Sequence, residues 1–546
     1  MRRPYTSGSE IALVGQLAAA VSLASFFYYL RHGDLLSYGD AVAHINIARR
    51  LFDSRTPGLL QLGTVWLPLP HLLMLPFLIP RWMWQTGIGG SIPSLFSFVL
   101  SVIGVFRLLE TVLVSDRSPV SATTRFPAWL AAGIFALNPN LGYLQTTAMT
   151  EPIYLAFFIW AVVFFAEAIK ASGNERHAGQ RPLLWSGLCV LGACLTRYDG
   201  WLLAAVMIVL VLVLASRSRF VNLRSSTAKF VLIAAVGPIF WIGYNAAVYH
   251  NPLEFANGPY SAKAIEQKTA MPGTPPHPGT NDLPVAFQYF FKAAQLNLAT
   301  GKWQIFWVCS LLLGAAIVVL FQRKLWPMLL LWTPVPFYML SVAYSGVPIF
   351  IPPWWPFSRY NARYGIEMLP AFAVFASIAA YGLMRFAASK RARLIVGIVF
   401  VLLAVGSYVQ VWREGPVSFE EAVVNSRTRI ALEKVLANNF EMLPPESTFL
   451  MYLGDHVGAF QRAGIPLSQV INEGNHRSWK RPTDPEGLWE RALKDPAAYV
   501  NFVVAFDSDV VATKVNKSEL QALVVLRVTG QPETTIYTTI RSNHPR

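Results

Sequence analysis

Residues 11–53 read IALVGQLAAAVSLASFFYYLRHGDLLSYGDAVAHINIARRLFD and join an apolar run to a charged segment. The run at 11–30 is long enough to cross a membrane, because about 20 apolar residues span the hydrocarbon core as a helix. It follows a basic start and has no small-residue cleavage site, so we expect a retained first helix and not a signal peptide. The charged segment then begins where the chain leaves the bilayer.

The composition predicts a polytopic α-helical membrane protein. The chain has 546 residues, of which 54% are hydrophobic and 14% charged, and its mean hydropathy is +0.41. A segment at 66–80 is short and interrupted by prolines, which favours an interfacial piece over a span. Without it we predict roughly eleven transmembrane helices, in the segments 11–30, 92–114, 127–145, 152–171, 183–196, 201–215, 229–248, 303–321, 325–343, 364–386 and 394–412.

The net charge of +15 reflects Lys and Arg residues that gather in the short connections between these segments. In membrane proteins such residues mark the cytoplasmic side, so we expect no nucleic-acid partner. The N-terminus is then cytoplasmic in a plasma (inner) membrane. The loops 31–91, 138–151, 250–302 and 344–363 lie outside, and residues 1–412 form the membrane module.

Residues 413–546 have a different character. An amphipathic helix is predicted near 412–440, followed by short β-rich runs at 447–454, 499–506 and 520–528 that are bounded by turn residues. We expect a soluble extracytoplasmic α/β domain. The Pro- and Gly-rich segment 271–282 is predicted to be a mobile loop.

The segment GDAVAHINIARRLFDS places Asp40 and His44 four residues apart, on one face of a predicted helix. Gly39 frees the backbone before it, and Asp40 stands at the helix start. The simpler interpretation is a solvated acid at the headgroup level.

Four features resemble one family when taken in order along the chain. They are Asp40 after the first span, the segment TVWLPLPHLL at 64–73, MTEP at 149–152, and LTRYDGW at 195–201. Together they resemble the GT-C class of integral membrane glycosyltransferases over roughly residues 1–410. The nearest relatives would be polyprenyl-phosphate-sugar-dependent enzymes, such as protein O-mannosyltransferases and lipid A aminoarabinose transferases.

The resemblance implies a sugar donor on a polyprenyl phosphate and a lipid, glycan or protein acceptor, met at the outer leaflet among the membrane lipids. An acid in the first external loop acts as general base in that family, which assigns Asp40 this role. A positioned base contributes about 10²–10⁴ in rate. One base opposite the leaving phosphate predicts inversion at the anomeric carbon.

Arginines suit the leaving phosphate, because the guanidinium group pairs two phosphate oxygens and stays charged. The candidates are Arg359 and Arg363, with Arg197 and His44 as weaker ones. Anchoring to lipid headgroups is the alternative for the first two.

Two further acids are candidates. The resemblance implies that Glu151 lines the active site in an acceptor-binding or base-orienting role, although charge complementation at a helix start would also explain it. Asp199 lies near membrane depth, where an unpaired acid is costly. Arg197 is a possible partner, and a purely structural ion pair remains open.

We expect no cofactor and do not favour a divalent metal, because Glu151 is the lone carboxylate of its loop and hard cations prefer several. The pattern Asp507, Ser508, Asp509 is interpreted as a turn after a strand. His456 and His476 are interpreted as surface or core histidines. The three cysteines lie in apolar runs and predict neither a disulfide nor a zinc site.

Two other functions stay open. A transporter or flippase of a lipid-linked precursor would place ionisable groups near the membrane midplane. The predicted spans are almost free of them, and the acids gather at the outer ends. A receptor or assembly protein would lack a cavity around Asp40.

Overall fold

The computed structural model describes residues 8–113, 122–172, 179–217, 224–269, 273, 275–475 and 487–540. The chain divides into two compact units. We call Met1–His32, Pro93–Trp241 and Ala256–Glu421 the helical unit, and Gly33–Ile92, Ile242–Phe255 and Ala422–Arg546 the mixed unit. The regions 33–92 and 242–255 therefore group with the C-terminal region and not with the helices between which they lie in the sequence.

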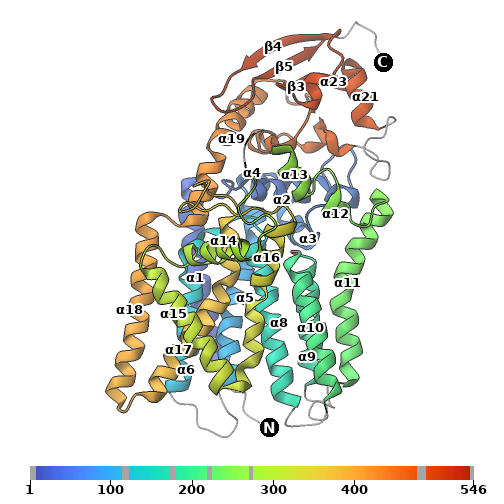
Figure 1. Cartoon of the computed structure of the whole chain (residues 1–546). Helices are drawn as coiled ribbons and strands as arrows, with labels where there is room; N and C mark the ends of the chain where they lie inside the picture. Colours follow the sequence, from blue (N-terminus) through green and yellow to red (C-terminus); the bar gives the residue numbers. More distant parts are fainter. Residues whose placement is uncertain are drawn as a thin grey trace. The chain divides into compact units, whose positions relative to one another are not determined.

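Long apolar helices dominate the helical unit (Figure 1). Within the described ranges, nine helices are long and apolar enough to cross a membrane. The long helices are α1 (Gly8–His32), α5 (Ile88–Leu113), α6 (Ala122–Ala136), α8 (Glu151–Ser172), α9 (Gln180–Cys194), α10 (Asp199–Ser216), α11 (Arg224–Tyr249), α15 (Trp303–Ala316), α16 (Pro334–Tyr344), α17 (Leu369–Phe386) and α18 (Lys390–Glu414). Each overlaps one of the predicted segments. Helices α15 and α16 reach spanning length only with adjoining helical residues, as Trp303–Phe321 and Lys324–Tyr344, whereas α6 and α9, with 15 residues each, are not among the nine.

Shorter elements complete this unit. They are α7 (Pro139–Leu144), α12 (Glu254–Asn257), α13 (Ala262–Thr269), α14 (Leu283–Leu296), η3 (Ile317–Phe321), η4 (Arg323–Trp332) and η5 (Ala362–Met368). The predicted span 127–145 is broken, because Asn138 caps α7 and Pro139 opens it. Within the predicted mobile loop, buried His277 donates from Nε2 to the carbonyl oxygen of Ile349 at 3.0 Å. Residues 271, 272 and 274 lie outside the described ranges.

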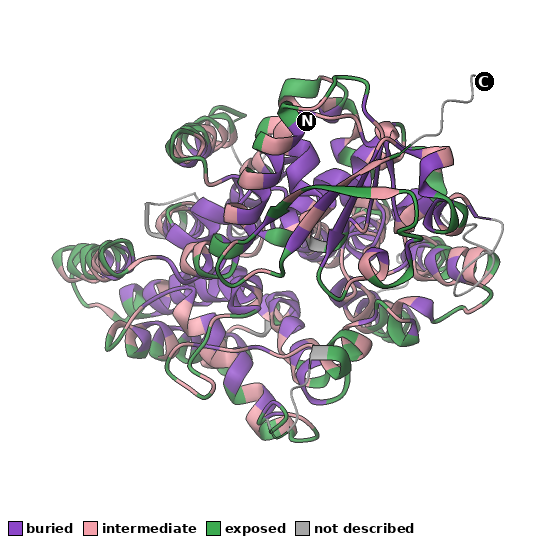
Figure 2. Cartoon of the chain, turned by 90° about the horizontal axis from the view of Figure 1, so that it is seen from above, coloured by how far each residue is buried: buried purple, intermediate pink, exposed green. Residues whose placement is uncertain are grey.

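Burial differs sharply among the helices (Figure 2). Helix α17 is buried over nearly its whole length, whereas α1, α11 and α18 expose large apolar side chains such as Phe27, Ile239 and Leu402. An apolar surface of this kind is what lipid contact requires. Helix α17 therefore forms the core of the helical unit, and the other three supply lipid-facing surface.

The mixed unit combines short helices with a sheet. Its helices are α2 (Gly39–Arg50), η1 (Leu59–Leu62), α3 (Leu69–Leu78), α4 (Arg81–Thr86), α19 (Val417–Glu441), η6 (Gly454–His456), α20 (Gly458–Ala463), η7 (Leu467–Gln469), η8 (Glu473–Asn475), α21 (Leu488–Lys494), α22 (Pro496–Tyr499) and α23 (Val510–Lys514). Helix α3 has only 10 residues, which agrees with a segment too short to span. Helix α19 is the predicted amphipathic helix, and Gly415 with φ of 93° ends α18 before it.

The sheet contains β1 (Phe449–Met451), β2 (Val470–Ile471), β3 (Phe502–Phe506), β4 (Leu520–Leu526) and β5 (Thr534–Thr539) in the order β2-β1-β3-β5-β4. Strand β1 is parallel to β2 and β3, and β5 is antiparallel to β3 and β4. Leu450, Val503 and Trp489 pack in its core. This confirms the predicted α/β character of the C-terminal region.

Candidate active site

Four carboxylates gather within the helical unit because four helical elements begin there. Glu151 opens α8, Asp199 opens α10, and Glu367 lies in η5 just before α17. Glu421 lies in the first turns of α19, which belong to the helical unit up to that residue. An acid at a helix start is favoured by the helix dipole. All four side chains are buried, with exposed fractions between 0% and 2%. Buried charges of this kind require partners.

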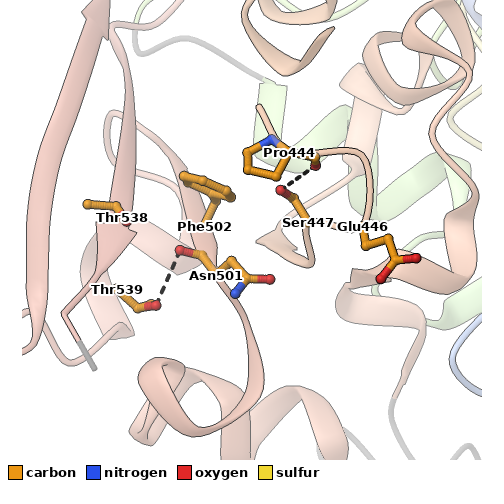
Figure 3. Close-up of a pocket in the computed structure, with 7 residues that line it drawn as sticks. All are labelled: Pro444, Glu446, Ser447, Asn501, Phe502, Thr538 and Thr539. Carbon is orange, nitrogen blue, oxygen red and sulfur yellow. Dashed lines mark hydrogen bonds between the residues drawn. The ribbon is translucent and has the colours of Figure 1, made fainter. Parts of the chain in front are cut away.

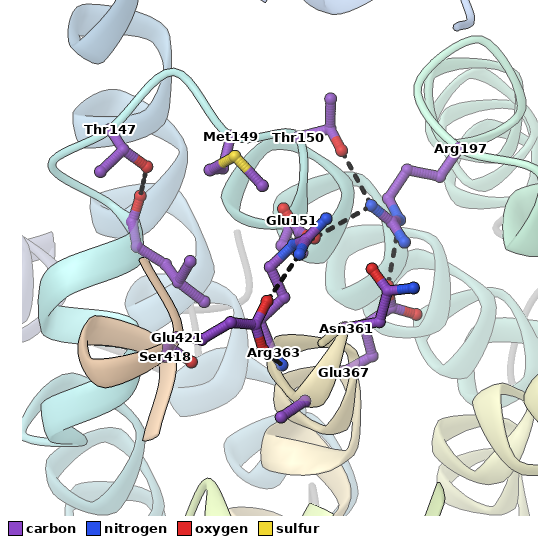
Figure 4. A network of polar contacts seen from close by, with 12 residues as sticks. Thr147, Met149, Thr150, Glu151, Arg197, Asn361, Arg363, Glu367, Ser418 and Glu421 are labelled. Carbon is purple, nitrogen blue, oxygen red and sulfur yellow. Dashed lines mark hydrogen bonds and ion pairs between the residues drawn. The ribbon is translucent and has the colours of Figure 1, made fainter. Parts of the chain in front are cut away.

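Arg197 is the hub of this network (Figure 4). Its Nε lies 3.2 Å from Asp199 Oδ2 and 3.0 Å from Glu367 Oε1, and its Nη1 lies 3.2 Å from Glu151 Oε1. Nη1 also donates to Thr150 Oγ1, and Nη2 donates to the Tyr338 hydroxyl at 2.8 Å. The predicted partner of Asp199 is therefore present, but Arg197 also binds two further acids.

Arg363 is the second guanidinium of the network. Its Nε lies 3.2 Å from Glu151 Oε1, and its Nη1 lies 2.7 Å from Glu421 Oε1. The Tyr364 ring contacts both arginines, with its centroid 5.0 Å from the Arg197 guanidinium carbon and 4.9 Å from that of Arg363. In this arrangement both guanidiniums are occupied by carboxylates.

Glu151 is held from one side. Both arginines bind its Oε1, whereas its Oε2 is buried and has no hydrogen-bond partner in the described part of the chain. The second oxygen is thus left able to accept a hydroxyl hydrogen, provided that a substrate group reaches it.

Asp40 lies in the mixed unit, in the first turn of α2, and is partly exposed. His44 follows one turn later and is buried. Its Nδ1 lies 2.9 Å from Nε2 of His71, and its ring centroid is 4.6 Å from that of Trp66. The face shared by Asp40 and His44 therefore leads from a solvent-accessible carboxylate to a buried histidine pair.

The remaining charges of that segment have structural partners. Arg49 binds Asp53 at 2.8 Å and the carbonyl oxygen of Leu78 at 2.6 Å, which ties α2 to α3. Asp53 also accepts a hydrogen bond from the backbone of Ser468. These contacts explain why the sequence places Arg49 and Asp53 directly after Asp40 without giving either a role in chemistry.

Arg359 differs from Arg363 in its surroundings. Arg359 is partly exposed in the segment between α16 and η5, whereas Arg363 is buried among acids. Of the two arginines predicted to bind phosphate, Arg359 is the one within reach of solvent.

Other polar sites carry no metal geometry. No group of three or more His, Cys, Asp or Glu side chains in the described ranges is placed to hold a metal ion. Asp509 caps α23 by accepting from the backbone of Ala512, as expected for a turn after β3. His456 packs on Phe506, with ring centroids 4.6 Å apart. His476 lies outside the described residues.

A pocket with a volume of about 360 Å³ lies in the α/β region of the mixed unit (Figure 3). Its hydroxyl groups bond within the domain: Ser447 donates to the carbonyl oxygen of Pro444 at 2.6 Å, and Thr539 donates to that of Asn501 at 3.2 Å. None of the predicted site residues lines it.

The sequence prediction missed Glu367, Glu421 and Tyr338. Glu367 lies inside the predicted span 364–386, where a charged residue requires a partner, and Glu421 follows the predicted span 394–412. That signal marks them as candidates but does not say which cation each one meets.

No protein-family model and no curated protein sequence matches the chain. Solved structures do match it. ArnT from Cupriavidus metallidurans bound to undecaprenyl phosphate aligns at 13% identity over 99% of this chain and 100% of that one, with a TM-score of 0.57. The apo form of the same protein aligns at 14% identity over 97% and 98%, with a TM-score of 0.54. An oligosaccharyltransferase from Archaeoglobus fulgidus aligns at 11% identity over 92% and 69%, with a TM-score of 0.47. The polytopic GT-C fold predicted from the sequence is therefore confirmed.

Proposed function

We propose that this chain, which shares the GT-C fold, is an inverting glycosyltransferase. It moves a sugar from a polyprenyl-phosphate donor to a lipid, glycan or protein acceptor at the outer face of the membrane. The observation that carries the proposal is the fold match over essentially the whole chain to ArnT, whose structure contains undecaprenyl phosphate. A carrier of the same chemistry suits a chain with lipid-facing helices.

Asp40 is the general base of the proposed reaction. It takes the proton of the acceptor hydroxyl while the acceptor oxygen bonds to the anomeric carbon of the sugar and the bond from that carbon to the phosphate oxygen breaks. Polyprenyl phosphate leaves on the opposite side, so the anomeric configuration inverts. The partial exposure of Asp40 supports this role, since an acceptor has to approach it.

The arginines and the acids other than Asp40 either bind substrate or orient side chains that bind it. Arg359 is the proposed phosphate ligand, because it is accessible and its guanidinium suits phosphate oxygens. Arg197 and Arg363 orient Glu151, whose Oε2 is the proposed acceptor-binding atom. Asp199 fixes Arg197, and His44 supports the substrate pocket through its contact with Trp66.

The proposed placement is a plasma (inner) membrane with the N-terminus in the cytoplasm and residues 413–546 outside. The distribution of Lys and Arg along the sequence supports it. A single cysteine in place of exposed Met442, in a cysteine-free background, should react with an impermeant maleimide added to intact cells. Labelling only after membrane disruption would indicate the opposite orientation.

The function is tested by transfer from a defined donor panel. The purified full chain in lipid nanodiscs is incubated with a series of undecaprenyl-phosphate sugars and with lipid, glycan and peptide acceptors. We expect undecaprenyl phosphate and glycosylated acceptor in equal amounts, with inverted anomeric configuration by NMR. If a donor crosses the membrane of vesicles that contain the protein, and no donor–acceptor pair gives a glycosylated product, the flippase alternative is supported instead.

A further inference from the structure

Two carboxylates of the network share the same donors. Asp199 Oδ2 and Glu367 Oε1 lie 3.2 Å and 3.0 Å from Arg197 Nε, and 3.3 Å and 2.8 Å from the Tyr338 hydroxyl. The Tyr338 oxygen accepts from Arg197 Nη2, so its single hydrogen points toward the acids. One N–H and one O–H thus face two carboxylate oxygens.

Charge counting points to an additional proton. Among the described residues, the network contains the acids Glu151, Asp199, Glu367 and Glu421 and two guanidinium groups, Arg197 and Arg363. All four acids are buried. Two neighbouring carboxylates in a buried site cannot both ionise without a large free-energy cost, as the paired acids of aspartic proteases illustrate.

We propose that Asp199 and Glu367 hold one proton between them and that Glu367 is a positioning residue for Glu151. The pair then carries one negative charge, which balances the positive charge of Arg197. The charge of Glu421 balances that of Arg363, whose Nη1 lies 2.7 Å from Glu421 Oε1. The remaining negative charge of the network is then assigned to Glu151. Its Oε2, like that of Glu367, is buried and has no hydrogen-bond partner in the described part of the chain.

The pair has titratable neighbours from three helices and one turn. They are Tyr154 from α8, Cys194 at the end of α9, Arg197 from the connection between α9 and α10, and Tyr338 from α16. Glu151 shares Arg197 with the pair, and the ring of Tyr364 stacks on that of Tyr338. Arg197 is the one permanent cation among them, so loss of the shared proton would leave two acids on one guanidinium. Raising the pH should therefore loosen the anchoring of Glu151.

The shared proton is measured directly by infrared spectroscopy of the full chain. The wild type should show absorption from a protonated carboxyl group that disappears in Glu367→Gln. Glu433→Gln is the matched control, since Glu433 is equally buried and binds the two guanidiniums of Arg429 and Arg462. That control should keep the band. Absence of a protonated-carboxyl band in the wild type, or its survival in both Glu367→Gln and Asp199→Asn, overturns the proposal.

The positioning role rests on the proposed function and has its own measurement. Glu367→Ala should lower kcat about 10²-fold, because a misplaced group costs that much, and Glu367→Gln should recover a large part of the loss. The alkaline fall in kcat of the wild type should be absent in Glu367→Gln. An unaltered pH profile in that variant contradicts the role. If no transfer is found at all, the infrared result still decides the shared proton, so the two failures are distinguishable.

Discussion

Glu151 and Arg363 lie 212 residues apart in the sequence and meet at 3.2 Å between Oε1 and Nε. Through this contact the start of α8 is tied to η5, and Arg363 extends the tie to Glu421 at the start of α19. Arg197 adds the start of α10 through the same oxygen of Glu151. These helix starts are therefore joined by largely buried ion pairs.

Substituting Arg363 should destabilise the protein strongly. Arg363→Ala leaves Glu151 and Glu421 short of a cation in a buried site, and breaking a buried pair in this way costs about 3–5 kcal/mol. The thermal midpoint of the detergent-solubilised chain measures the effect. Arg385→Ala serves as control, because Arg385 is exposed on α17 and its loss should change stability by about 0.5 kcal/mol or less. Similar midpoints for the two variants would show that the network contributes little.

Acidification should destabilise the protein through His71. Burial, together with neighbouring His44 and Arg50, lowers the pKa of His71 well below 6.5. Below pH 6.5 His71 binds a proton in the unfolded chain but not in the folded chain. The free energy of unfolding therefore has its full value above that pH and falls as the pH decreases. The thermal midpoint should drop between neutral pH and about pH 5, and less so in His71→Gln. Parallel curves for both proteins would remove His71 as the cause.

Alanine substitutions at Asp507 and Asp509 should distinguish a helix cap from a metal site. Asp509→Ala removes the cap of α23 and should cost about 1 kcal/mol, whereas exposed Asp507 should be replaceable by Ala with little effect. Chemical denaturation of the full chain, with and without Mg²⁺ or Mn²⁺, gives both values. A metal-induced stabilisation that either substitution abolishes would favour a cation site instead.

Arg359 should affect donor binding. Replacing it with Gln removes charge-assisted hydrogen bonds to phosphate, each worth about 1.5–3 kcal/mol, so KM for the lipid-phosphate donor should rise about 10- to 100-fold. The acceptor KM should change far less. Arg385→Gln is the matched control, because Arg385 is exposed on α17 and does not lie in the segment that contains Arg359. Equal donor KM values for Arg359→Gln and wild type would return Arg359 to headgroup anchoring.

The helices were predictable because lipid-exposed segments carry an uninterrupted apolar pattern. Segments such as 201–215 and 364–386 match α10 and α17 to within a few residues. The break at Asn138 was not predicted, because the apolar run continues past it. Pro139 occupies the first position of a new helix, where proline is favoured. Strands β2 and β5 were also missed. Strand β2 has only two residues and β5 consists mainly of threonine and tyrosine, so neither has a clear apolar alternation.

The site was predictable in its residues more than in its pairings. Asp40, Glu151 and Asp199 stand out because each acid follows or opens an apolar run. Which arginine meets which acid depends on long-range packing, and the contact between Arg363 and Glu151 has no local signature. Glu367 was missed because its cost of burial is offset by Arg197 and Tyr338, which lie far away in the sequence.

The role of Asp40 is the central claim, and the turnover of one isosteric variant tests it most directly. The kcat of Asp40→Asn is compared with that of Asp34→Asn, an acid six residues earlier, at saturating undecaprenyl-phosphate sugar and acceptor. Loss of the general base should lower kcat about 10²–10⁴-fold in the first variant and leave the second at the wild-type value. Equal turnover of Asp40→Asn and wild type would contradict the account.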